Sequence, residues 1–276
     1  RRITVDRRLA SMWFGSSLRP DGWAPPPPWD AVAGDYRTTD GWIRLHTNAP
    51  AHRAAALGVL GVAEDRQLVV DAGGCAATMH SADEWAASAQ GRSVAAEPLV
   101  RWDDLGALPS IQNRERQPDP ARPLAGVRVL DLTRVLAGPV ATRLLAQLGA
   151  DVLRVDPPWW DEPGVVPDVM LGKRSTRLDL RVAEHRDRFA DLLAGADILV
   201  HGYRPGALDS LDLGEDVRRD LAPGLIEVSL DAYGWSGPWA GRRGFDSLVQ
   251  MSTGIADAGM RLMGREVPTP LPVQAL

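Results

Sequence analysis

Residues 241–254 read GRRGFDSLVQMSTG and hold one carboxylate, Asp246, at the start of an apolar stretch. The turn-rich run YGWSGPW (233–239) precedes it. A lone carboxylate at the mouth of an apolar helix could have a chemical role. The alternative is a plain helix N-cap, which is a common role for Asp. The local sequence alone favours the cap.

Basic residues and glycine-rich turns follow the predicted strands of the second half of the chain. Arg134 and Gly138-Pro139 follow the first strand, GKRSTRLDL (172–180) follows the second, and Arg204 follows the third. In a parallel sheet, ligands bind at the carboxyl ends of the strands. We therefore expect these cations, with Lys173, Arg174 and Arg177 close together, to converge on one edge and to suit a phosphate-bearing ligand. Each of them taken singly is more often a solvated surface charge.

Several other site types are not supported. GxxxxGK[ST] is absent, and LAGPVATRLL has too few glycines for a dinucleotide fingerprint. Ser236 lies in GWSGP, which lacks the GxSxG form of a nucleophile elbow. For His201, the sequence favours a structural role, with its ring nitrogens hydrogen-bonded inside the protein, over contact with a ligand. No two histidines have metal-ligand spacing, so we expect no metal site; the five are His46, His52, His80, His185 and His201.

Charge and composition exclude further classes. The formal net charge is −5 and the pI about 5.6, so no basic surface for nucleic acid is predicted. Cys75 is the single cysteine, which excludes an intrachain disulfide and a multi-cysteine metal site. No apolar run has the roughly 18 residues of a membrane span, and RRITVDRR (1–8) lacks the apolar core of a signal peptide. We therefore expect a cytoplasmic protein.

Strands and helices alternate in the second half of the chain, which predicts a Rossmann-like parallel sheet with right-handed crossovers. The predicted strands are 127–132, 151–156, 197–203 and 225–230, and the predicted helices are 138–150 and 185–196. Four prolines and several charges mark 109–123 as a linker. Before it, the sequence predicts a strand at 42–46, a helix at 50–61 and a helix capped by Ser81 with Glu84 in a capping box.

The second half resembles the large domain of the class III CoA-transferases, a family that also includes α-methylacyl-CoA racemases. The matching run is 124–257, and its pieces have the family's order and spacing: PLAGVRVLDLTRVLAGPVATRLLAQLGADVLRVDPP, GKRSTRLDL, ADILVHGYRPGALDSLDLG and LIEVSLDAYGWSGPWAGRRGFDSLVQMSTGI. Residues 33–61 and 79–100 resemble segments of the family's smaller domain. Those segments usually follow the large domain, so the order here is permuted or fused, or the chain is incomplete.

The resemblance implies an α/β fold: a Rossmann-like CoA-binding large domain at 124–276 and a smaller α+β domain at 1–108, joined by the linker 109–123. It further implies an interlocked homodimer or a partner half-chain. The implied substrates are an acyl-CoA and a carboxylic acid, with coenzyme A as the group transferred and no tightly bound cofactor. No nucleic-acid or membrane partner is expected.

Residue roles also follow from the resemblance. An aspartate at the position of Asp246 is the nucleophile of the family's transferases and passes through a mixed anhydride and an aspartyl-CoA thioester. This match favours the nucleophile over the N-cap. The resemblance assigns CoA contacts to Arg134, Ala137, Gly138, Pro139, Lys173, Arg174 and Arg204, and a thioester-lining loop to Tyr233, Gly234 and Gly237.

Three alternatives remain. The family's racemases pair the aspartate with a histidine and commonly place one directly before it; here that residue is Phe245, and no histidine lies between 202 and 276. This favours transfer over racemisation or epimerisation. A non-catalytic CoA-binding subunit is the second alternative. A Rossmann-like oxidoreductase is the third and the weakest, because the glycine fingerprint is missing. The sequence does not specify the acyl donor or acceptor.

Overall fold

The computed structural model describes residues 20–27, 29–60, 66–104, 106 and 119–271. Contacts divide the chain into two units. Unit 1 consists of 103–230 with short terminal stretches, and unit 2 joins Pro27–Trp102 to Asp231–Val273. The sequence predicts one domain over 124–276, whereas residues 231–273 group with the N-terminal stretch in the structure. Residues 109–118 of the predicted linker lie outside the described residues.

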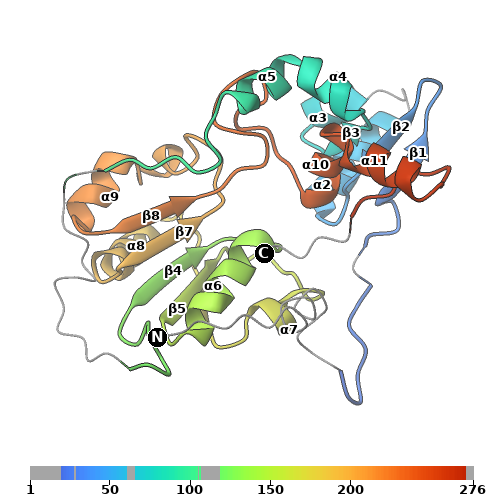
Figure 1. The fold of residues 1–276 in the computed structure, drawn as a ribbon. Coiled ribbons are helices and arrows are strands. Elements are labelled where there is room, and N and C mark those ends of the chain that lie inside the picture. The colour runs from blue at the N-terminus through green and yellow to red at the C-terminus, as the bar shows by residue number, and fades with distance from the viewer. Residues whose placement is uncertain (1–19, 28, 61–65, 105, 107–118, 272–276) are drawn as a thin grey trace. The chain divides into compact units, whose positions relative to one another are not determined.

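Unit 1 is built on a parallel five-stranded sheet in the order β6-β5-β4-β7-β8 (Figure 1). Its strands are β4 (Arg128–Leu132), β5 (Asp151–Asp156), β6 (Arg174–Arg177), β7 (Ile198–His201) and β8 (Ile226–Ser229). The four strands predicted in this region are confirmed. The strand β6 was not predicted, because RSTR contains no apolar residue and hydrophobic periodicity therefore gives no signal there.

Helices connect the strands of unit 1. They are α6 (Ala137–Gln147), α7 (Val166–Val169), α8 (Ala183–Ala194) and α9 (Glu215–Leu221), with a 3-10 turn at Asp209–Leu211. Alternate residues of β4 face opposite sides of the sheet. Leu130 and Leu132 belong to one core cluster with Phe189 of α8, and Val129 belongs to another with Leu145 of α6. Apolar cores on both faces explain the near-continuous hydrophobic strands.

Unit 2 contains an antiparallel sheet in the order β1-β2-β3. Its strands are β1 (Gly34–Arg37), β2 (Trp42–Leu45) and β3 (Ala76–Thr78), and its first helices are α2 (Pro50–Leu60) and α3 (Arg66–Asp71). The helices α4 (Ala82–Ala87) and α5 (Ala89–Ala95) follow. The capping box of Ser81 and Glu84 is confirmed: the Ser81 hydroxyl accepts from Glu84 N–H, and the Glu84 carboxylate accepts from Ser81 N–H.

Two helices from the C-terminal stretch complete unit 2: α10 (Asp246–Ser252) and α11 (Ile255–Leu262). Figure 1 shows both, in red, beside the blue strands of the sheet. Leu248 and Met251 of α10 share a buried core cluster with Cys75 and Ala77. The N–H of His80 also donates to the carbonyl of Met251 over 2.9 Å. This shared core is why 231–273 belongs with the N-terminal stretch.

Crossing a membrane requires a long apolar helix, and none of the helices in the described ranges meets both conditions.

Candidate functional site

Asp246 is the first residue of α10, and Phe245 occupies the N-cap position without a side-chain cap bond. The Asp246 carboxylate does not cap the helix. It instead accepts hydrogen bonds from the amide of Gln250, one turn later, with Nε2 3.1 Å from both Oδ1 and Oδ2. Asp246 is exposed, whereas Gln250 is buried. The structure therefore leaves Asp246 exposed to solvent, with its carboxylate oriented by the side chain of Gln250.

The pKa of Asp246 is raised above its ordinary value. Partial desolvation by the surrounding protein is the main cause, while the Gln250 hydrogen bond and the charge of Arg44 on β2 act in the opposite direction. A raised pKa means that the carboxylate is less stabilised, and therefore more basic, than that of an ordinary surface aspartate. This property suits a nucleophile.

Two imidazoles contact Phe245, the residue directly before Asp246, and the sequence did not predict this arrangement. The ring of His46 stacks on the ring of Phe245, with centroids 3.7 Å apart and planes 8° from parallel. His52 of α2 meets the same phenyl ring edge-on at 5.9 Å. The pKa of His46 is lowered to about 4 by burial and by the positive charges of His52 and Arg44. His46 is therefore neutral at physiological pH.

Some buried polar atoms around this position have no hydrogen-bond partner within the described ranges. They include Nδ1 of His46, Nδ1 of His52 and the hydroxyl of Ser247. Buried polar groups in native proteins are nearly always paired, so orphans gathered near one carboxylate favour a site that takes a ligand. No signal in a single sequence could have found the histidines, because their relation to Asp246 exists only after unit 2 has folded.

The predicted thioester-lining loop also lies in unit 2. Tyr233 is buried, and its carbonyl accepts from Nε2 of Gln90 over 2.7 Å. Gly234 has φ +94° and Gly237 has φ +83°. A Cβ on Gly237 would lie 2.6 Å from Oε1 of Gln90. Both positions thus require glycine, and the loop has one fixed path over α5.

In unit 1, the loop between β4 and α6 lies at the carboxyl end of the sheet. Val135 in this loop has φ +67°, which is a strained conformation for a β-branched residue. Its N–H donates to Oε1 of Glu162 over 2.7 Å, which holds the turn. No side chain caps α6 at Leu136. Ala137 and Gly138 therefore begin a helix whose first turn can accept an anion.

Arg134 in the same loop is half-buried between aromatic rings. Its guanidinium lies 4.7 Å from the centroid of Trp160 and 5.7 Å from that of Tyr203. Arg204 follows β7 and is exposed. Both arginines thus come directly after strands, at the edge where the sequence analysis expected them. The structure orders Arg134 by stacking, which limits the entropy that it would lose on binding an anion.

Lys173 was expected at the ligand-binding edge of the sheet, but its side chain is buried inside unit 1. Its side chain is 0% exposed, and its ammonium donates to Asp131 over 2.9 Å, to the carbonyl of Pro139 over 2.7 Å and to the hydroxyl of Thr142 over 2.6 Å. Burial lowers the pKa of Lys173, and the carboxylate of Asp131 opposes that shift. All three ammonium donors are therefore used inside the protein, where they fix the start of α6.

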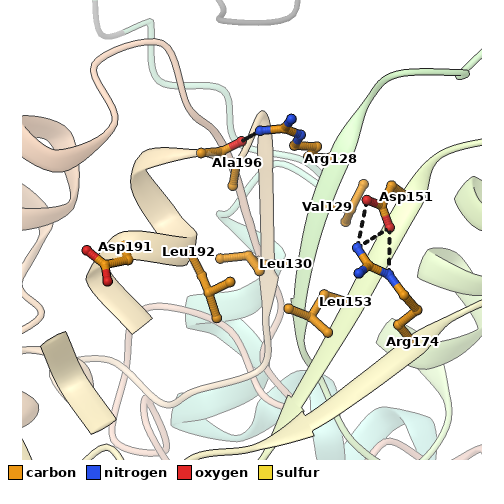
Figure 2. A pocket seen from close by; sticks show the side chains of 10 residues that line it. Arg128, Val129, Leu130, Asp151, Leu153, Arg174, Asp191, Leu192 and Ala196 are labelled. Atoms are coloured by element: carbon orange, nitrogen blue, oxygen red, sulfur yellow. Dashed lines mark hydrogen bonds and ion pairs between the residues drawn. The ribbon is translucent and has the colours of Figure 1, made fainter. Parts of the chain in front are cut away.

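Arg174 does not join the other cations. It opens β6 and pairs with Leu153, and its guanidinium forms a forked ion pair with Asp151 at the start of β5, at the amino end of the sheet (Figure 2). The expected convergence of Arg174 on the carboxyl edge is therefore wrong, since β6 was not recognised. The pocket of about 310 Å³ at this opposite edge also holds Arg128 and Asp191, so its charges are mixed.

Gly138 lies where the β4–α6 loop is too closely packed for a larger side chain. A Cβ here would lie 2.3 Å from the Thr133 side chain, whose hydroxyl donates to buried Asp131. We expect Gly138→Ala to destabilise unit 1 by about 1–3 kcal/mol through overpacking. Denaturant unfolding measures the loss, and a free energy of unfolding equal to that of the wild type would contradict the prediction.

The model of CoA-transferase family III matches residues 124–274, which is more than half of the chain. The chain belongs to this family. Its other similarities agree with that assignment. The acetyl-coenzyme A transferase nodX of Hypoxylon pulicicidum is 38% identical over 177 residues, which cover 62% of this chain and 28% of that protein.

The probable fatty acyl-CoA transferase Rv3272 of Mycobacterium tuberculosis is 35% identical over 166 residues, covering 55% of this chain and 40% of that protein. A crystal structure of Rv3272 superposes with a TM-score of 0.49 at 34% identity, covering 56% of this chain and 46% of that one. The chain thus spans less than half the length of these relatives.

Proposed function

We propose that this chain carries the nucleophile of a CoA-transferase that moves CoA between an acyl-CoA and a carboxylic acid. The observation that carries the proposal is the state of Asp246: an exposed carboxylate of raised pKa, held by Gln250 instead of capping its helix. The family assignment and the transferase names of the relatives support the same chemistry.

The proposed reaction uses four acyl transfers. The Asp246 carboxylate attacks the acyl-CoA carbonyl, and CoA thiolate leaves to give a mixed anhydride. The thiolate then attacks the aspartyl carbonyl and releases the donor acid, leaving an aspartyl-CoA thioester. The acceptor carboxylate attacks this thioester and expels the thiolate to give a second anhydride. Attack of the thiolate on the acceptor carbonyl forms the new acyl-CoA and restores Asp246. Together, the four acyl transfers replace one difficult exchange of CoA by a series of easier steps.

CoA contacts in this proposal come from the carboxyl edge of the unit 1 sheet. Arg134, already ordered by its two rings, and exposed Arg204 supply charge for phosphate groups. Ala137, Gly138 and Pro139 form a helix start, where the N–H groups of Ala137 and Gly138 can donate to an anion and Pro139 contributes no donor. Lys173 acts indirectly, by fixing that helix start from inside. The loop 233–237 lines the thioester, and the active protein is an interlocked homodimer or includes a partner half-chain.

A second candidate is racemisation at the α-carbon of an acyl-CoA. The observation that favours it is the pair of imidazoles, His46 and His52, that contact the ring of Phe245, the residue directly before Asp246. Racemisation needs an acid and a base at the α-carbon. Incubation of a chiral 2-methylacyl-CoA in deuterium oxide tests it. Exchange of the α-hydrogen would support a racemase, and transfer of CoA without exchange would support the first proposal.

Intact-mass spectrometry with hydroxylamine tests the transferase proposal. The protein is incubated with a panel of acyl-CoAs, and hydroxylamine traps any activated carboxyl group as a hydroxamate. We expect a hydroxamate that maps to Asp246 and is absent from Asp246→Ala. A folded protein that binds CoA but forms no adduct with any donor would instead indicate the racemase or a purely binding subunit.

A further inference from the structure

Gln250 makes an unusual set of contacts. Its side chain is 2% exposed, although it lies on the same helix face as the exposed Asp246, four residues away. Besides its two contacts with the carboxylate, it is bonded twice to the backbone of Leu271: Nε2 donates to the carbonyl over 2.9 Å, and Oε1 accepts from the N–H over 2.7 Å. Every polar atom of the amide is therefore used.

The bonds to Leu271 fix the orientation of the amide. A glutamine amide can turn over and exchange its oxygen for its nitrogen. Here the Leu271 N–H requires an acceptor, and the Leu271 carbonyl requires a donor. Turning the amide over would break both bonds and aim the oxygen at the Asp246 carboxylate, where two acceptors repel. The backbone at 271 thus ensures that the nitrogen faces Asp246.

The segment carrying Leu271 is itself held tightly. The N–H of Thr269 donates to the carbonyl of Ala256 in α11 over 3.1 Å. Gly259 of α11 allows this approach, since a Cβ there would lie 2.0 Å from the Thr269 carbonyl oxygen. A chain of fixed contacts therefore runs from α11 through 269–271 to the amide of Gln250. The donor that reaches Asp246 is preorganised by the fold.

We propose that Gln250 is the positioning residue of the nucleophile and the donor that stabilises the aspartyl carbonyl oxygen in the two steps in which the aspartyl carbonyl is attacked. This inference rests on the proposed function of Asp246. One N–H of the amide spans both carboxylate oxygens in the free enzyme. Once Asp246 is acylated, one of these oxygens remains as a carbonyl. It becomes an oxyanion when the thiolate attacks the aspartyl carbonyl of the first anhydride, and again when the acceptor carboxylate attacks the aspartyl-CoA thioester. The Gln250 N–H keeps its proton and donates to that oxygen.

The role is more than structural, because the contact acts on the charge of the reacting group. The hydrogen bond favours the ionised form of Asp246, whose pKa is otherwise raised by desolvation. Loss of the donor should therefore raise the pKa of Asp246 further and remove stabilisation of the tetrahedral oxyanion. A residue that only braced the fold would lower stability without changing the pH dependence of the reaction.

The test compares Gln250→Met, which has a similar shape but no donor, with Gln250→Glu, which still accepts from Leu271 N–H. Asp257→Asn is the control: Asp257 is buried on α11 and pairs with Arg261, so its loss tests packing in the same unit. Circular dichroism checks folding. We expect both Gln250 variants to lose on the order of 10²-fold in kcat with little change in KM, and Asp257→Asn to keep the wild-type rate.

The acid limb of the pH–rate profile provides the second readout. We expect it to move to higher pH in Gln250→Met and further in Gln250→Glu, where a second carboxylate faces Asp246. Wild-type kcat and an unmoved acid limb in a folded Gln250→Met protein would overturn the inference. The hydroxylamine adduct of the wild type separates the two proposals: its absence would refute the nucleophile itself, whereas its presence with unchanged variants would refute only the role of Gln250.

Discussion

Asp246→Asn is expected to lower the rate of CoA transfer by on the order of 10³-fold or more, because it removes the nucleophile and not merely a binding contact. CoA affinity should change little, since the proposed CoA contacts lie in unit 1. Asp246→Glu should also be impaired: the extra methylene would move the carboxylate away from the amide of Gln250, which is 3.1 Å from both oxygens. Steady-state kinetics with a trapped-adduct assay measures both variants.

Asp216→Asn is the matched control, because Asp216 is likewise a carboxylate in the first turn of a helix, α9, but lies in unit 1. It should retain full activity. If Asp246→Asn keeps a rate within about tenfold of the wild type, the covalent mechanism is wrong, since loss of a nucleophile cannot be so mild.

The same site predicts the direction of the pH dependence. Only the ionised carboxylate attacks, and desolvation raises the pKa of Asp246. Activity should therefore be full at neutral pH and decline as the pH falls, beginning above the range in which an ordinary aspartate protonates. The pKa of His46 is about 4, so this imidazole is neutral at neutral pH, where activity is expected to be full.

Lys173→Met should destabilise unit 1 by about 3–5 kcal/mol, because it leaves the buried charge of Asp131 without its cation. Both side chains are 0% exposed, so water cannot replace the ammonium. The bonds to Pro139 and Thr142 are lost as well. Denaturant unfolding followed by circular dichroism, with hydrogen exchange of peptides from β4 and α6, measures the loss where it occurs.

The double variant Asp131→Asn with Lys173→Met distinguishes a broken ion pair from simple loss of packing. Removing both charges should recover part of the stability lost in Lys173→Met alone. Arg174→Met provides the surface comparison, because Arg174 and Asp151 are largely exposed, and it should cost no more than about 1 kcal/mol. Similar losses in Lys173→Met and Arg174→Met would show that burial of the first pair contributes nothing.

Apolar strands were predictable from sequence, whereas polar and short ones were not. The strands β4, β5, β7 and β8 read as hydrophobic runs because both faces of a parallel sheet are covered. β6 carries no such run, and missing it placed Arg174 at the wrong edge. Lys173 shows the same limit: adjacent basic letters cannot reveal that one side chain is enclosed and its neighbour is exposed.

The site was predictable only where a local motif carried it. Asp246 stands out in GFDSLVQ, but its partners lie elsewhere in the fold. The stack of His46 on Phe245 joins residues far apart in the chain, and the orientation of Gln250 is set by the backbone of Leu271. Periodicity describes which face a residue lies on, whereas such contacts depend on how separate segments pack together.

The two-segment composition of unit 2 has a consequence for the order of events on the ribosome. The first segment, 27–102, emerges with β1, β2 and β3, but Leu248 and Met251, which pack against Cys75 and Ala77, are translated only after all of 103–230. The buried cluster that Cys75 and Ala77 form with Leu248 and Met251 can therefore be completed only after the whole intervening segment has been synthesised.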